Sequence, residues 1–576
     1  MNEAKVLDAA MIEQMLALLP AQEQARLFML ATDEGATDEQ VEQAAREALE
    51  SIDWATQRDQ IRELISRIMP LETLVPDVYA AWRPVIRDAV AWTGSRLSTE
   101  RLVPKLVEQM LLPAEMPLEQ RLLMLIARMP GLQKLGQIVA RNPNLAPSFR
   151  DELTRLENSI QDITPDEIRA EIERQLGKYL KIYRVELEDV NLAEASVSAA
   201  VRFTWFNPVT RRREQGVFKV LKPYVLEYFP EEMAILQGLA DFFDTNRDNY
   251  DLPPVGLREV MDDVRRLLEW EVNLPAEQAH LTAAYERYKN VRGVRVPRLL
   301  RELSTPTITA MSEEEGVKVT DAYPDDEVRR KRLAGRMIKA LIAVPMFAPE
   351  EESFFHADPH AGNLFADEQT GELIILDWAL VERLSREQRR QTVLLTLGVA
   401  LRDERRIFDA IAALSEDDLR ADATRASIVR GHVARFFDRF ALLEVPGFAE
   451  VMTLLDGIAF SGVRFPAELL MFRKVLFTLE GVLHDVAPDI KIDLVLARYA
   501  LKLLPAEAPA RLLRPLTDPS ATFRTHLSNY DLTALVLSIP LLGHRLWLQT
   551  AERITERGLA ELQRALFRLQ GDEVMR

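Results

Sequence analysis

At 576 residues, with 48% hydrophobic and 28% charged side chains, the chain can bury a sizeable core, which excludes wholesale disorder. Its length predicts several domain-sized units. A formal net charge of −18 argues against nucleic acid as a partner, because phosphate backbones favour basic surfaces. The lack of cysteine excludes disulfides and thiolate metal sites, and it favours a reducing, cytoplasmic setting.

Neither a secretory signal nor a membrane-spanning helix is predicted. The residues after Met1 do not form a basic start followed by an apolar stretch. The apolar stretch from Leu532 to Gly543 is about 12 residues long, short of the roughly 20 that cross a bilayer. It also contains Pro540. A peripheral contact with a membrane surface stays open as an alternative.

Residues 1–130 are predicted to be helical. Apolar residues recur at helical spacing from Met11 to Leu19, and Thr37 with Gln40 has the pattern of a capping box. The apolar stretch from Leu118 to Ala140 also has helical spacing. Nothing in this region carries recognisable chemistry, so a helical regulatory or docking region is the expectation.

A further helix is predicted to start at Thr164-Pro165-Asp166-Glu167, with a cap, an early proline and a capping-box acid. Its apolar face is predicted to carry Ile168, Ile172 and Leu176.

The pattern changes to strands near Tyr183. Val197 to Phe206 is rich in small, β-branched and aromatic residues, Asn207-Pro208 marks a turn, and Gly216 to Leu221 reads as the returning strand. Another extended run includes Thr307 to Thr309. From Val317 onward helices dominate, interrupted by short strands. The order predicts a small β-rich lobe followed by a larger helical one.

The strongest chemical signal is His356-Ala-Asp358-Pro-His-Ala-Gly-Asn363, followed by Asp377 at the end of an apolar run. Asp358 and Asn363 have the spacing of a kinase catalytic loop, and Asp377 matches the magnesium-binding Asp. We expect Asp358 to act as a base or to orient water, and Asn363 and Asp377 to hold Mg²⁺. The alternative is an Asp and an Asn that only cap turns.

A kinase-like site also needs a strand lysine for the nucleotide phosphates and a helix glutamate that fixes it. Lys219 and Glu277 suit these two catalytic roles, and the order Lys219, Glu277, Asp358, Asn363, Asp377 is that of kinases. The alternatives are a lysine on an exposed hairpin and a solvated helix acid.

With these motifs the chain resembles the UbiB-like (AarF/ADCK) family of atypical protein-kinase-like proteins, from about Gly131 to about Leu504. Lys134-Leu-Gly-Gln137 is similar to the family's K-x-G-Q motif, and Glu271-x-Asn273 lies where the family has E-x-D. Ala193-Glu-Ala195-Ser196 is similar to the alanine-rich loop that replaces a glycine-rich loop.

The resemblance implies a protein-kinase-like bilobal α+β fold with added N-terminal and C-terminal helices. It implies ATP or ADP and Mg²⁺ as cofactors, with Ala193, Ala195, Ser196, Lys219 and Met311 at the nucleotide. It implies that Lys134, Gln137 and Glu271 belong to a helical cover over the cleft where an ordinary kinase binds its peptide, with Lys134 pairing with Glu271. A snorkelling surface lysine is the alternative for Lys134.

The family's ties to ubiquinone and other isoprenoid lipids imply partners among lipids or quinone-pathway components and a membrane surface, besides the nucleotide. The corresponding division is 1–130 N-terminal helices, 131–180 K-x-G-Q extension, 181–316 N-lobe, 317–504 C-lobe and 505–576 C-terminal helices.

Departures from the family pattern are Asn273 for the second acid of E-x-D, Ala361 for a loop proline, Trp378-Ala379 for Phe-Gly, and Ala199 for a glutamine. Trp378-Ala379 predicts a stiffer hinge at the magnesium loop. His356 is expected to brace the catalytic loop, whereas His360 either contacts phosphate or lies on the loop surface.

Three functions remain open from the sequence. The first is a Mg-dependent ATPase that supports ubiquinone or isoprenoid-lipid metabolism. The second is a phosphotransferase acting on a small molecule or protein. The third is a nucleotide-gated scaffold without catalysis.

Overall fold

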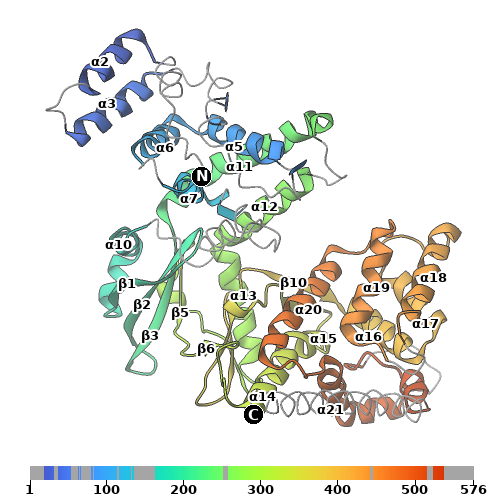
Figure 1. The fold of residues 1–576 in the computed structure, drawn as a ribbon. Helices are drawn as coiled ribbons and strands as arrows, with labels where there is room; N and C mark the ends of the chain where they lie inside the picture. The colour runs from blue at the N-terminus through green and yellow to red at the C-terminus, as the bar shows by residue number, and fades with distance from the viewer. Residues whose placement is uncertain are drawn as a thin grey trace, which may run out of the picture. The chain divides into compact units, whose positions relative to one another are not determined.

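The computed structural model divides the chain into two compact units, whose elements are drawn in Figure 1. The first unit takes residues 1–279 and 298–313, and the second takes residues 280–297 and 314–576. The finer division into five segments stays a prediction. The structure describes residues 19–31, 37–52, 62–63, 65, 80–81, 83–112, 116–131, 133–134, 163–250, 257–440, 445–515 and 523–537.

The first unit begins with helices, as predicted. Their described bounds are α2 (Ala21–Ala31), α3 (Asp38–Glu50), α5 (Arg83–Arg96), α6 (Thr99–Leu111) and α7 (Leu118–Ile126). The predicted capping box at α3 is confirmed, because the Gln40 amide donates to the Thr37 hydroxyl and the Thr37 amide donates to the Gln40 side chain. Except for Leu19, the helix predicted from Met11 to Leu19 lies outside the described residues.

The segment predicted to be helical from Leu118 to Ala140 is helical at 118–126, 130–131 and 133–134, but it is not one continuous helix. α7 ends at Ile126, Arg128 has a φ of 54°, and Pro130 follows. A left-handed residue and a proline both interrupt helical hydrogen bonding, so the apolar stretch does not continue as one helix. Residues 135–140 lie outside the described residues.

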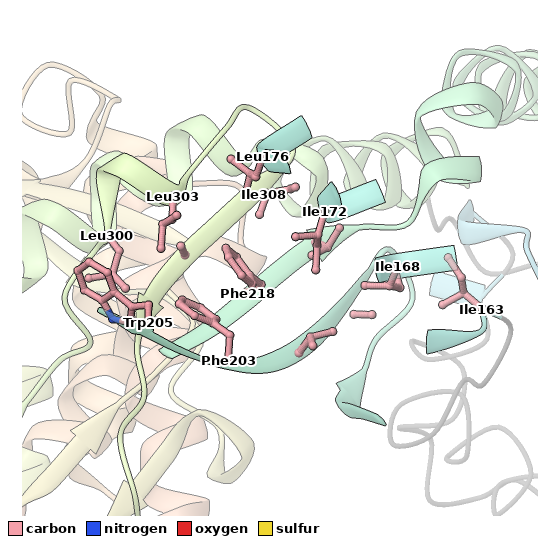
Figure 2. Close-up of a cluster of buried hydrophobic side chains, with 14 residues drawn as sticks. Ile163, Ile168, Ile172, Leu176, Phe203, Trp205, Phe218, Leu300, Leu303 and Ile308 are labelled. Carbon is pink, nitrogen blue, oxygen red and sulfur yellow. The ribbon is translucent and has the colours of Figure 1, made fainter. Parts of the chain in front are cut away.

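α10 (Pro165–Ile182) begins where the sequence predicts. The Glu167 amide donates to the Thr164 hydroxyl, and the Glu167 carboxylate accepts from the Thr164 amide at 2.8 Å. The three residues predicted on its apolar face are almost fully buried: Ile168, Ile172 and Leu176. Figure 2 shows them against the aromatic residues of the neighbouring sheet.

That sheet has the antiparallel order β1-β2-β3-β5. Its strands are β1 (Glu186–Glu194), β2 (Ser198–Asn207), β3 (Arg212–Leu221) and β5 (Ile308–Ser312). The strands predicted over 197–206 and 216–221 and the turn at Asn207 are therefore confirmed. Phe203 and Phe218 stack with ring centroids 4.0 Å apart (Figure 2). Gly216 is required beside them, because a Cβ there would lie 2.5 Å from the Phe203 ring.

Strand β1 was not predicted from the sequence. It is an edge strand, and most of its side chains are exposed, including the charged Glu186, Glu188 and Asp189. Charged residues are a usual protection of sheet edges, and they remove the alternation by which a strand is recognised.

The helices α11 (Pro223–Thr245) and α12 (Leu257–Val272) pack together through buried Leu236, Leu239, Val264 and Leu268. They are followed by α13 (Leu274–Tyr288), within which the boundary between the units falls.

The second unit contains two small sheets. One has the order β4-β9-β8-β6, and the other pairs β7 with β10. The strands are β4 (Val294–Arg295), β6 (Val317–Lys318), β7 (Glu352–His356), β8 (Leu364–Ala366), β9 (Leu373–Ile375) and β10 (Val381–Ser385). As predicted, short strands border the Asp358 and Asp377 segments.

Helices make up most of the rest of this unit. They are α14 (Glu327–Ile338), α15 (Val344–Met346), α16 (Arg386–Leu401), α17 (Glu404–Leu414), α18 (Ala423–Phe437), α19 (Phe448–Phe460), α20 (Ala467–Val486) and α21 (Ile492–Leu512). The predicted α+β class is confirmed. Among the helices that the structure describes, none is long and apolar enough to cross a bilayer.

Candidate functional site

Lys219 and Glu277 form the pair that the sequence predicts. Lys219 lies on β3, on the face opposite the buried Phe218 and Val220, and its ammonium donates to both Glu277 carboxylate oxygens at 2.8 and 2.9 Å. The Glu277 side chain is 4% exposed and that of Lys219 is 19% exposed. The buried acid therefore fixes a lysine that remains partly open to a ligand.

The local sequence explains how Glu277 reaches this place. The Asn273 side chain accepts from the Ala276 amide at 3.1 Å, and its carbonyl accepts from the Glu277 amide. Asn273 thus starts α13 as a helix cap, a role that asparagine performs well. The family's second acid is replaced here by a residue that turns Glu277 toward β3.

Of the residues predicted to bind the nucleotide, Met311 lies on β5 opposite Val217, which places it on the same sheet face as Lys219. Ala193 lies in β1, one residue before its end, Ala195 donates its amide to the Ser198 carbonyl at 2.8 Å, and both alanines are exposed. The short methyl side chains therefore leave the outer side of this turn open.

Two side-chain contacts hold the alanine-rich turn in place. The Ser196 hydroxyl donates to Glu271 at 3.2 Å. The Glu194 carboxylate lies 2.9 Å from the ammonium of Lys222, whose side chain is fully buried. Sequence reasoning missed this second pair, and its only signal was an acid within a run of small residues. A charge-assisted buried contact makes the turn stiffer than a glycine-rich loop.

The predicted pair between Lys134 and Glu271 is confirmed as an ion pair, with both side chains largely buried. Glu271 thus contacts both Lys134 and the Ser196 turn. Gln137, the last residue of the K-x-G-Q motif, lies outside the described residues.

A buried charge cluster, also missed from the sequence, holds the chain just before Lys134. Glu232 on α11 accepts from the Gly131 amide at 2.6 Å and pairs with Arg101 of α6. Arg101 also pairs with Glu231 at 2.8 Å and donates to the Arg128 carbonyl. Burial raises the pKa of Glu232, although the Arg101 charge opposes this. The acids and their partners in this cluster are more than a hundred positions apart, so no local pattern in the sequence indicates the cluster.

In the second unit, His356 organises the catalytic loop, as predicted. Its Nδ1 accepts from the Asp358 amide at 3.2 Å, so its Nε2 carries the proton and donates to the Leu376 carbonyl at 3.1 Å. Burial lowers the pKa of His356, which keeps the ring neutral. Asn363 donates its side-chain amide to the Asp358 carbonyl at 3.1 Å and its carbonyl accepts from Leu376. These bonds tie the two predicted magnesium segments together.

Asp377 follows directly and has a φ of 51°, a left-handed conformation in which Asp and Asn are the commonest non-glycine residues. Its Oδ1 accepts from the Ala379 amide at 3.2 Å. Left-handed backbone is a form of stored strain that redirects a side chain, and it occurs often at functional sites.

Trp378, which stands in place of the Phe of Phe-Gly, is held by several contacts, and the stiffer hinge expected from it stays a prediction. Its ring is 1% exposed and packs edge-on to His356 with centroids 4.9 Å apart, and near Tyr288 at 5.9 Å. Its indole nitrogen donates to the Ile375 carbonyl.

His360 lies at the loop surface, the second of the two roles considered for it. Its Nδ1 accepts from the Gly362 amide at 3.0 Å, and its Nε2 is 3.7 Å from an Asp358 oxygen. Within the described residues there is no group of three or more His, Asp or Glu side chains that could hold a metal. The oxygen atoms of Asn363 and Asp377 fit Mg²⁺ bound jointly with phosphates, the way magnesium is usually held.

The candidate residues thus fall into two sets, each built within one unit. Lys219, Glu277 and Glu271 belong to the first unit, and Asp358, Asn363 and Asp377 to the second. That both sets act on one nucleotide stays a prediction.

Comparison with known proteins gives the relationships of the chain. The ABC1 atypical kinase-like domain matches residues 155–411. This range contains every candidate site residue except those of the K-x-G-Q motif.

Two curated proteins are similar over more than half of the chain. The chloroplastic "Protein ACTIVITY OF BC1 COMPLEX KINASE 7" of Arabidopsis thaliana is 26% identical over 62% of this chain and 50% of its own length. A "Probable protein kinase UbiB" of Xanthomonas oryzae is 26% identical over 65% of this chain and 68% of its own length. The chain thus spans about half the length of the Arabidopsis relative.

Among solved structures, a Mycobacterium tuberculosis protein in complex with erythromycin matches with a TM-score of 0.42 and 17% identity. That match covers 69% of this chain and 97% of the other.

Proposed function

The chain belongs to the UbiB-like family of atypical kinase-like proteins through its ABC1 domain, and on that premise we propose that it binds ATP with Mg²⁺ and hydrolyses it. We further propose that this activity supports ubiquinone or other isoprenoid-lipid metabolism. Family membership establishes a kinase-like protein, and the nucleotide, metal, reaction and pathway are what the proposal adds.

The pair between Lys219 and Glu277 is the observation that carries the proposal. A lysine fixed by a buried helix acid is what a kinase-like site uses to hold the α- and β-phosphates. Glu277 holds the Lys219 ammonium at a fixed place on β3, from which it would meet phosphate oxygens. Preorganised charge of this kind favours tight binding, because little is lost in ordering it.

The second unit supplies the remaining chemistry. Asn363 and Asp377 would hold Mg²⁺, which neutralises phosphate charge when bound. Asp358 lies on the loop that His356 fixes, and it would orient a water molecule or accept its proton. These residues suit transfer of a phosphoryl group from ATP to an oxygen.

Hydrolysis is favoured over protein phosphorylation by the K-x-G-Q motif. The ion pair between Lys134 and Glu271 supports a role for this segment as a built part of the nucleotide-binding unit. A segment anchored there would exclude a peptide substrate, whereas water needs no such access.

The experiment that tests the proposal measures phosphate release by the full-length protein from Mg-ATP, with and without a phenolic isoprenoid headgroup analogue. Release without a labelled acceptor, abolished in Asp358→Asn, supports the ATPase. Transfer of labelled phosphate to the analogue or to a protein would instead indicate a phosphotransferase. Binding with no turnover, unchanged in Asp358→Asn, would overturn catalysis and leave a scaffold.

The pathway rests on the relatives that carry the UbiB name. We expect a lipid or quinone-pathway component to be the partner, at a membrane surface reached from the cytoplasm. Deleting the gene should lower the cellular isoprenoid quinone content, and the wild-type gene, but not the Asp377→Asn variant, should restore it.

A further inference from the structure

Four positive side chains gather in the second unit around the end of α14. Arg336 lies on α14, and Lys339 follows one turn later. Arg292 lies beside them, because its carbonyl accepts from the Lys339 ammonium at 3.3 Å. Lys502 is on α21, which packs against residues 339–343.

Two glycines, Gly293 and Gly371, lie close to the Arg336 side chain. A Cβ on Gly293 would lie 2.9 Å from the Arg336 Nε, and one on Gly371 would lie 2.9 Å from its Nη1. Both glycines have positive φ, at 81° and 72°. The guanidinium therefore passes along two glycines that have left-handed backbone and no side chain, and its position is built rather than accidental.

Within the part of the chain that the structure describes, these four cations make no ion pair with a carboxylate. The neighbouring acids Asp367 and Glu372 pair instead with Arg295, at 2.9 and 3.3 Å. Burial lowers the pKa of Lys339, and the charges of Lys502, Arg336 and Arg292 lower it further. In a chain of net charge −18, four cations with no carboxylate paired to them form a local positive region, and such a region attracts anions.

The backbone at Lys339 is also unusual. Residues 339–343 form a π-helix, in which the Val344 amide donates to the Lys339 carbonyl. The Ala340 carbonyl that it bypasses accepts instead from the buried Tyr288 hydroxyl at 2.8 Å. Single π-turns inside helices occur often at functional sites, because they turn one side chain out of the regular spacing. Here the side chain at the start of the π-turn is Lys339.

From this geometry we propose that Arg292, Arg336, Lys339 and Lys502 form a binding site for a multivalent phosphate anion. A phosphate ester carries close to two negative charges near neutral pH and offers several acceptor oxygens, so it can meet cations from separate segments. A single carboxylate would neutralise only one of the four. The same chemistry is presented by a free polyphosphate and by the phosphomonoester headgroup of an anionic lipid.

This site shares no residue with the proposed nucleotide site and does not depend on the proposed ATPase. The test uses Arg292→Gln/Lys502→Gln, in which both replaced side chains are exposed and their loss leaves the fold intact. A Lys339→Gln variant tests the π-turn lysine. The matched control is Arg405→Gln/Lys474→Gln, which removes the same charge from exposed positions of the same unit.

Two probes distinguish the sources of phosphate. The first is tripolyphosphate, titrated calorimetrically into the full-length protein with excess ADP present to occupy the nucleotide site. The second is sedimentation with phosphatidylcholine vesicles that contain or lack phosphatidic acid, whose headgroup is a phosphate monoester. We expect the double variant and Lys339→Gln to lose about tenfold or more in affinity for the probe that binds, and the control to stay close to wild type.

Binding of tripolyphosphate alone identifies a free anion, and binding of the anionic vesicles alone identifies a lipid headgroup. The proposal is overturned if the wild-type protein binds neither probe. It is also overturned if the double variant binds them as the wild type does, because the four cations then serve no anion.

Discussion

The Lys219 ammonium lies between both carboxylate oxygens of Glu277, at 2.8 and 2.9 Å, and the acid is the more deeply buried of the two. The pair is therefore asymmetric: Glu277 is shielded from solvent, whereas the Lys219 side chain is partly exposed. That asymmetry is what a phosphate-binding lysine requires.

Lys219→Met should weaken Mg-ATP binding by about ten- to a hundredfold, because it removes a charge-assisted contact to phosphate. Equilibrium binding of a fluorescent ATP analogue measures this. Lys178→Met on the exposed surface of α10 makes the same change outside the site and should bind normally. Equal affinities in the two variants would refute the role of Lys219.

Asp377→Asn should lower the affinity for Mg-nucleotide by about tenfold or more, because the side chain that would bind the metal loses its negative charge. Asparagine tolerates the left-handed backbone and can still accept from the Ala379 amide, so folding is retained. The measurement is thermal stabilisation by ATP across a magnesium titration. Asp325→Asn, at an exposed position, is the control. Unaltered stabilisation of Asp377→Asn by Mg-ATP would count against the metal assignment.

Arg101→Met should lower the free energy of unfolding by about 3–5 kcal/mol, because the buried Glu232 carboxylate then has no cation beside it and the partly buried Glu231 loses its ion pair. Arg258→Met is a matched control in the same unit. That arginine also pairs with two acids, Asp241 and Asp244, but at the surface, so its loss should cost at most about 1 kcal/mol. Urea unfolding compares the two, and similar losses would show that the Arg101 cluster is not a buried network.

The free energy of unfolding should fall as the pH decreases from about 6.5 to about 4, because His526 is buried in its neutral form. Burial lowers its pKa to about 4, and its Nε2 lies 2.8 Å from the Met346 carbonyl. The neutral ring is therefore favoured in the folded state: its contribution is fully present above pH of about 6.5 and is lost toward pH of about 4. The shift corresponds to on the order of 3 kcal/mol.

The check is the pH dependence of unfolding in His526→Asn, a residue that accepts the φ of 60° at this position. The variant should show a flatter profile between these limits. The exposed His484→Asn should keep the wild-type profile. An unchanged slope in His526→Asn would mean that other groups cause the acid sensitivity.

Local signals allowed much of the fold to be predicted from the sequence. The caps at Thr37 and Thr164 are marked by residues three positions apart, and β2 and β3 by alternation of buried and open side chains. The order of the motifs also predicted the pairs of Lys219 with Glu277 and of Lys134 with Glu271, because each role needs a particular charge.

The features that were missed depend on the folded chain. Strand β1 is held by pairing with β2, not by its own apolar pattern. The buried pairs of Arg101 with Glu232 and of Lys222 with Glu194 join segments whose sequences show only ordinary charges. The π-turn at Lys339 adds one residue to a helical turn. The nearby Pro345 is the sequence feature that accompanies it, and a proline alone does not predict a π-turn.

The buried indole of Trp378 gives the magnesium loop an optical reporter of its own. Its ring lies against His356 and directly follows Asp377, so a ligand that changes the loop changes the polarity around a fluorophore. Emission from this tryptophan, taken as the difference from Trp378→Phe, would let the kinetics of ligand arrival be followed in stopped flow without any added dye.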